Sequence, residues 1–89
     1  MSKPKVDLGP RPIEVQRAIV EQEREAYANT IYQLELRLEG QERLKSVLGA
    51  DVAEAIKALT RQHTEALVLI AFLDEKLAAL PSEEGAKAA

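Results

Sequence analysis

Apolar or small side chains recur in alternating steps of four and three residues along the second half of the chain. Only His63 interrupts the apolar character of this seam, whose members are Val52, Ile56, Leu59, His63, Ala66, Ile70, Leu73, Leu77 and Leu80. A repeat of about 3.5 residues keeps one side of a helix turned toward a partner helix. The pattern therefore predicts a helix over 52–80 that packs against another helix.

The first half carries a less regular seam with the same steps. Its members are Ile13, Arg17, Val20, Arg24, Tyr27, Ile31, Leu34, Leu38, Gln41, Lys45 and Leu48. Pro12 suits the first turn of a helix, and the stretch 13–39 contains neither Gly nor Pro and is rich in helix-forming residues. We predict a helix over 12–48, with a possible break at Gly40.

Turn signals separate the two segments. Gly49 suits the left-handed position that closes a helix, while Asp51 followed by Glu54 resembles a capping box that opens the next one. A turn over 49–51 would make the helices antiparallel neighbours, with residue n of the first near residue 100 − n of the second. The predicted fold class is therefore all-α, a long antiparallel helical hairpin that resembles a coiled coil and assembles into a four-helix or larger bundle.

A pair of β-strands is the competing interpretation of two segments. Residues 32–40 alternate between apolar and polar side chains, and 67–73 would supply the second strand. The stretch 51–80 has no Gly, Pro or Asn to form the turn that such a strand needs. Outside the helices, we predict a flexible arm over 1–11, which contains Lys3, Lys5 and Arg11, and a disordered tail over 81–89.

Composition narrows the range of functions. The chain has 89 residues, enough for one domain, with a net charge of −3, no Cys and no Trp. The lack of Cys excludes disulfides and thiol chemistry and fits the cytoplasm. The longest apolar run, 66–73, has eight residues, whereas a membrane-spanning helix needs about 20. No signal peptide is visible. We expect an intracellular protein without a membrane span.

His63 is the one residue of the seam with catalytic or ligand chemistry. It either fixes the register of the helices, as a polar seam residue, or lies at the edge of the seam in contact with water. As a functional group it would be a pH switch or a metal ligand. The chain has no second His, and Thr60 and Thr64 are better explained as helix-surface residues than as nucleophiles. We predict no catalytic residue, no cofactor and no metal site.

The middle of both helices is apolar on more than one side, so two helices alone cannot cover it. We predict an interaction surface there, formed by Tyr27, Ile31, Tyr32, Leu34, Leu36, Leu38, His63, Leu67, Val68, Leu69, Ile70, Phe72 and Leu73. Its occupant would be a second copy of the chain or a larger protein partner.

These features predict a non-enzymatic assembly or adaptor protein that acts through protein–protein contacts and self-association. One alternative is a small accessory or inhibitor protein, a viral one included, that docks on a larger partner. A second alternative is a nucleic-acid-binding bundle that resembles the ROP architecture in layout only. Nucleic acid is the weaker expectation because no basic face forms where glutamates dilute Arg17, Arg24, Arg37 and Arg43.

Overall fold

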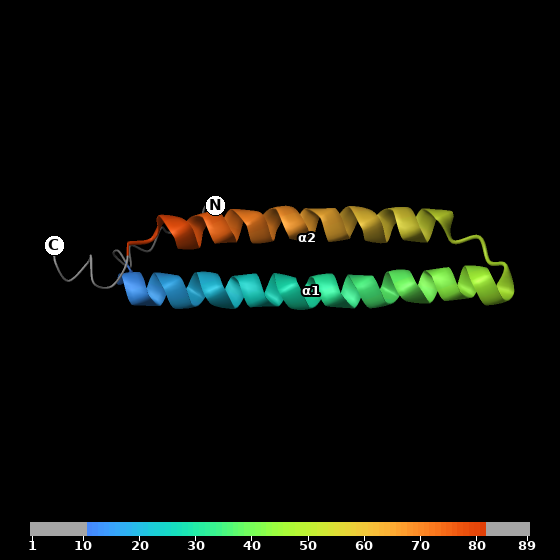
Figure 1. The fold of residues 1–89 in the computed structure, drawn as a ribbon, viewed down its shortest axis with the longest axis horizontal. Helices are drawn as coiled ribbons and strands as arrows, with labels where there is room; N and C mark the ends of the chain where they lie inside the picture. The colour runs from blue at the N-terminus through green and yellow to red at the C-terminus, as the bar shows by residue number, and fades with distance from the viewer. Residues whose placement is uncertain (1–10, 82–89) are drawn as a thin grey trace, which may run out of the picture.

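Two long antiparallel helices lie side by side in the computed structural model, which describes residues 11–81 (Figure 1). Helix α1 spans Ile13–Leu48 and α2 spans Ala53–Ala79, and no strand occurs within 11–81. The all-helical hairpin is confirmed, and the strand interpretation of 32–40 and 67–73 is wrong. Both helices begin one residue later than predicted, and α2 ends one residue earlier. Residues 1–10 of the predicted arm and 82–89 of the predicted tail lie outside the described residues.

Helix α1 runs through Gly40 without the break that its sequence suggested. A glycine inside a helix costs about 1 kcal/mol relative to alanine. The neighbouring seam residues Leu38 and Gln41 are both half-buried, and strong helix formers surround the glycine. Packing on either side therefore offsets the local cost and keeps the helix continuous.

The chain reverses at Gly49, which ends α1 in the left-handed conformation with φ of 65°. Its N–H donates to the Lys45 carbonyl at 3.0 Å. The predicted capping box does not form. The N-cap residue of α2 is Val52 rather than Asp51, so Asp51 lies one position before the N-cap. Its carboxylate accepts a hydrogen bond from the Ala53 N–H at 3.3 Å. The turn is therefore one residue longer than predicted.

The left-handed conformation of Gly49 predicts a simple mutational result. Gly49→Ala should lower the free energy of unfolding by about 1 kcal/mol, because a Cβ is strained at positive φ although nothing lies within 4 Å of it. Gly49→Asn should lower the free energy of unfolding by a smaller amount, since asparagine tolerates the left-handed region better than alanine does. Urea unfolding followed by circular dichroism measures both. Equal stability of Gly49→Ala and the unmodified chain would contradict this account of the turn.

Three polar contacts between the helices define their register. They join Arg17 to the Pro81 carbonyl at 3.1 Å, Arg24 to Asp74 at 2.5 Å and His63 to Glu35 at 3.1 Å. The residue numbers of each pair add up to 98, so residue n faces residue 98 − n. The expected relation of 100 − n is wrong by two residues. Non-helical residues in the turn cover more length than the 1.5 Å per residue of a helix, which displaces α2 along α1.

Candidate interaction surface

The seam of α2 is the contact between the helices. All of its nine positions, from Val52 to Leu80, are buried or half-buried, and every other residue of α2 is exposed. The buried hydrophobic residues of the described chain are Leu34, Val52, Ala66 and Leu73. The hairpin thus has a narrow core, one seam wide, as an alternating four-three repeat dictates.

The seam of α1 is covered only up to Gln41. Its last two members, Lys45 and Leu48, are exposed, and 72% of Leu48 is accessible to solvent. The register explains this difference, because the position opposite Leu48 would be residue 50, which lies in the turn before α2 begins. Leu48, which the seam pattern assigns to the core, is therefore left uncovered at the tip of the hairpin.

Arg24 occupies a seam position, and its guanidinium reaches the Asp74 carboxylate at the edge of the contact. The Asp74 carboxylate raises the pKa of the Arg24 guanidinium above its ordinary value, first through their hydrogen bond and then through charge attraction. A cation with a raised pKa contributes its stability at every pH below that ordinary value. An arginine is charged at every physiological pH in any case, so the contribution of the ion pair does not change within the physiological range.

His63 also reaches the edge of the seam, where its Nε2 lies 3.1 Å from the Glu35 carboxylate of α1. Its side chain is 23% exposed. Of the two positions that the sequence left open for His63, the structure shows the edge of the seam, with a partner on the other helix. No group of three or more potential metal ligands occurs among the described residues. Sequence reasoning missed Glu35 and Asp74, which can be found only when the register is known.

The predicted interaction residues divide into two sets. Leu34 and Leu73 are buried between the helices, where Tyr27, Ile31, Leu38, His63 and Ile70 are half-buried. The exposed remainder consists of Tyr32, Leu36, Leu67, Val68, Leu69 and Phe72. The first set belongs to the internal contact of the hairpin, and only the second is free to meet another molecule.

The exposed apolar residues lie on different sides of the hairpin. Helical periodicity places Tyr32 of α1 and Leu67 of α2 on one broad face. All six charged residues that α1 contributes to this face are glutamates, and α2 adds one lysine and one aspartate. We call it the acidic face; its charged members are Glu14, Glu21, Glu25, Glu35, Glu39, Glu42, Lys57 and Asp74.

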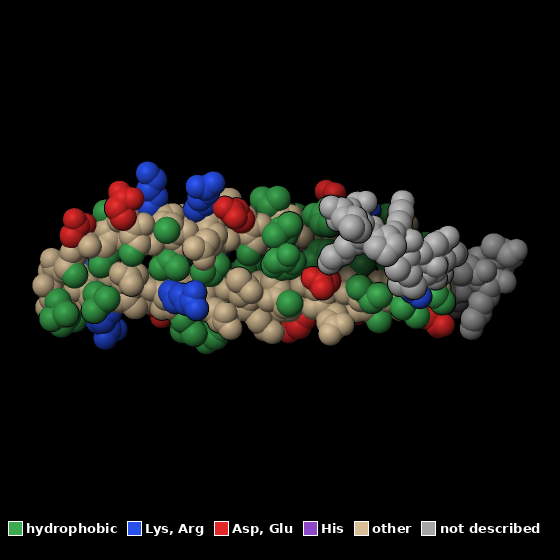
Figure 2. All heavy atoms as spheres, turned by 180° about the vertical axis from the view of Figure 1, so that it is seen from behind, with side chains coloured by type: hydrophobic (Ala, Val, Ile, Leu, Met, Phe, Trp, Pro, Cys, Tyr) green, Lys and Arg blue, Asp and Glu red, His purple; other side chains and the backbone are tan. Residues whose placement is uncertain are grey.

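The opposite broad face, toward which Figure 2 looks, has a different composition. Its charged residues are two acidic and two basic ones, which balance, and its remaining positions are apolar, small or uncharged. We call it the neutral face; its members include Ile19, Glu23, Ala26, Thr30, Arg37, Gly40, Glu65, Leu69, Phe72 and Lys76. Figure 2 shows hydrophobic side chains on both helices and in the groove between them.

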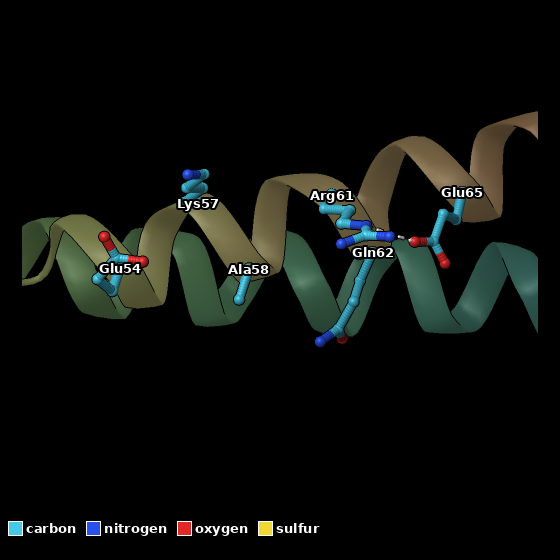
Figure 3. A pocket seen from close by; sticks show the side chains of 6 residues that line it. All are labelled: Glu54, Lys57, Ala58, Arg61, Gln62 and Glu65. Carbon is cyan, nitrogen blue, oxygen red and sulfur yellow. Dashed lines mark hydrogen bonds and ion pairs between the residues drawn. The ribbon is translucent and has the colours of Figure 1, made fainter.

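The outer surface of α2 near the turn carries a row of side chains with two acidic and two basic members (Figure 3). It consists of Glu54, Lys57, Ala58, Arg61, Gln62 and Glu65. Arg61 and Glu65 form an ion pair of 3.2 Å one helical turn apart, with side chains that are 83% and 62% exposed. Such pairs stabilise a helix by about 0.2–0.5 kcal/mol. The row is a solvated helix surface rather than an enclosed site.

The described part of the chain thus forms an antiparallel two-helix hairpin with one narrow core, one acidic face and one neutral face. Neither of the described helices is long and apolar enough to cross a membrane. No protein-family model, curated protein or solved structure matches the chain.

Proposed function

We propose that the protein is a non-enzymatic helical assembly or adaptor protein that associates with itself and acts through protein–protein contacts. The observation that carries the proposal is the surplus of apolar surface in the middle of the hairpin. Six of the thirteen residues expected at an interface remain exposed there after the two helices have packed. Leu69 and Phe72 are neighbours on the neutral face, one helical turn apart, and clustered exposed apolar surface commonly marks a contact with another protein.

The narrowness of the core supports self-association. In chains below about 70–80 residues, a single hydrophobic core rarely contributes more than about 3–5 kcal/mol to the free energy of unfolding, and oligomerisation is one way to gain further stability. Here 71 residues are described, and four of them are buried hydrophobics. A second hairpin that covers the exposed apolar residues of one broad face would stabilise the fold at the same time as it completes a four-helix bundle.

The alternatives have weaker support. A basic face for nucleic acid is not present among the described residues, because one broad face is acidic and the other has balanced charges. An accessory or inhibitor protein that docks on a larger partner would use the same exposed apolar residues, so it differs from our proposal only in the identity of the occupant.

Self-association predicts a mass and a concentration dependence. We expect light scattering after gel filtration to give at least twice the mass of one chain at tens of micromolar protein. The thermal unfolding midpoint should rise with protein concentration, because association stabilises the folded state by mass action. A monomeric mass at that concentration, together with a midpoint that does not depend on concentration, would contradict the proposal.

A further inference from the structure

We propose that a second copy of the chain covers the neutral face, with the tips of the two hairpins at opposite ends of a four-helix bundle. The two-fold axis of this dimer would pass between the two copies of Thr30 and between the two copies of Leu69. This inference rests on the proposed self-association and specifies its surface and geometry.

Charge selects the neutral face over the acidic one. Two acidic faces packed together would bring the six glutamates of one copy of α1 against those of the other, and Lys57 and the Arg24 guanidinium, which already pairs with Asp74, would offset only part of this charge. Like charges brought together at an interface cost free energy. The neutral face carries Glu23, Arg37, Glu65 and Lys76, whose charges cancel, so a second copy can approach it without net repulsion.

The order of residues along α1 fits an antiparallel copy of itself. When Thr30 faces Thr30 of the second copy, residue n lies opposite residue 60 − n, to within one residue. Glu23 then faces Arg37, and opposite charges meet twice across the two-fold axis. Within its own helix, the Thr30 hydroxyl donates to the Ala26 carbonyl at 3.0 Å, so its polar group is already satisfied at the centre of the contact.

Gly40 gains a role in this arrangement. It lies inside α1 at a cost to helix stability, and a Cβ built on it would meet nothing within 4 Å in the hairpin. The antiparallel register puts Ile19 of the second copy opposite Gly40. Ile19 is 48% exposed in the hairpin, and the space above a glycine allows such a side chain to pack closely against the helix.

The position of Leu69 in α2 fits the same two-fold axis. The relation 98 − n places Leu69 level with residue 29, one position from Thr30, so the two residues lie at the same height along the hairpin. Leu69 then faces itself and Phe72 faces Glu65 of the second copy. Phe72 is 49% exposed, and the Lys76 ammonium lies 5.6 Å from the centre of its ring. The Glu65 carboxylate would reach this ammonium at the edge of the contact.

Single cysteines test the face and the orientation, because the chain has none of its own. We expect Thr30→Cys and Leu69→Cys each to form a disulfide-linked dimer under mild oxidation, since each residue meets its own copy at the axis. The matched controls are Tyr32→Cys and Leu67→Cys, which are central and exposed but lie on the acidic face, and they should remain largely monomeric in denaturing gels.

A second variant separates assembly from folding. Gly40→Leu should preserve or raise the helical signal, because leucine is the better helix former, yet it should weaken dimerisation at least tenfold by occupying the position of Ile19. The control Ala18→Leu, on the acidic face, should leave the dimer unchanged. Sedimentation equilibrium measures both.

The outcomes distinguish this inference from the proposed function. A dimer that crosslinks through Tyr32→Cys or Leu67→Cys, but not through Thr30→Cys, would overturn the neutral-face contact and leave self-association intact. Disulfides formed only when Thr30→Cys is mixed with Leu69→Cys would indicate hairpins that point the same way, which overturns the orientation. Monomers throughout would overturn both proposals.

Discussion

Leu34→Ala is expected to lower the free energy of unfolding by about 2–5 kcal/mol, the usual cost of truncating a buried leucine. Leu34 is 2% exposed and is the most completely buried residue of the described chain. Within residues 11–81, no third helix lies beside this layer of the seam to fill the cavity. For so narrow a core, this loss approaches the whole stability of the hairpin.

Leu36→Ala is the matched control for this truncation. Leu36 lies two positions further along α1, carries the same side chain and is 50% exposed on the outer side of the helix. Its truncation should change the free energy of unfolding by less than about 0.5 kcal/mol. Urea unfolding at a fixed protein concentration measures both variants, and similar losses for the two leucines would contradict the arrangement of the core.

Ala66→Glu is expected to unfold the hairpin or to destabilise it by at least about 3 kcal/mol, because it would place a carboxylate without a partner in the seam. Ala66 is 5% exposed. A glutamate is much larger than this buried alanine, so it would be both too large for the site and unpaired. Circular dichroism would show the loss as a reduced helical signal and a lower unfolding midpoint.

Ala71→Glu provides the comparison for a charge added to α2 without burial. Ala71 is exposed on the acidic face, so the glutamate would stay in water and the hairpin should keep its fold with only a small loss. A stable, fully helical Ala66→Glu would show that this part of the seam does not pack against α1.

The pattern of apolar positions predicted the internal contact well because a helix has a fixed period. Every member of the α2 seam is at least half-buried, although the individual residues range from His63 to Leu73. The same pattern assigned too much of α1 to the core, since it cannot show where a partner helix begins. Leu48 is exposed for this reason and not because of its own side chain.

Local signals at the turn were less decisive. Gly49 adopts the left-handed conformation that its sequence position suggested, because few other residues occupy that region without strain. Asp51 and Glu54 had the spacing of a capping box, but the burial of Val52 moved the start of α2 by one residue. Tertiary packing therefore overrode a motif whose stabilising contribution is only about 1 kcal/mol.

The sequence by itself determined the two helices, the side of each that faces the other and the reversal at Gly49, because helical period and glycine conformation are local properties. Tertiary structure alone decided the register, since a shift of two residues depends on the length covered by the turn. That register pairs His63 with Glu35 and Arg24 with Asp74. It also sorts the exposed residues into an acidic and a neutral face, because the composition of a face depends on which residues of both helices lie side by side.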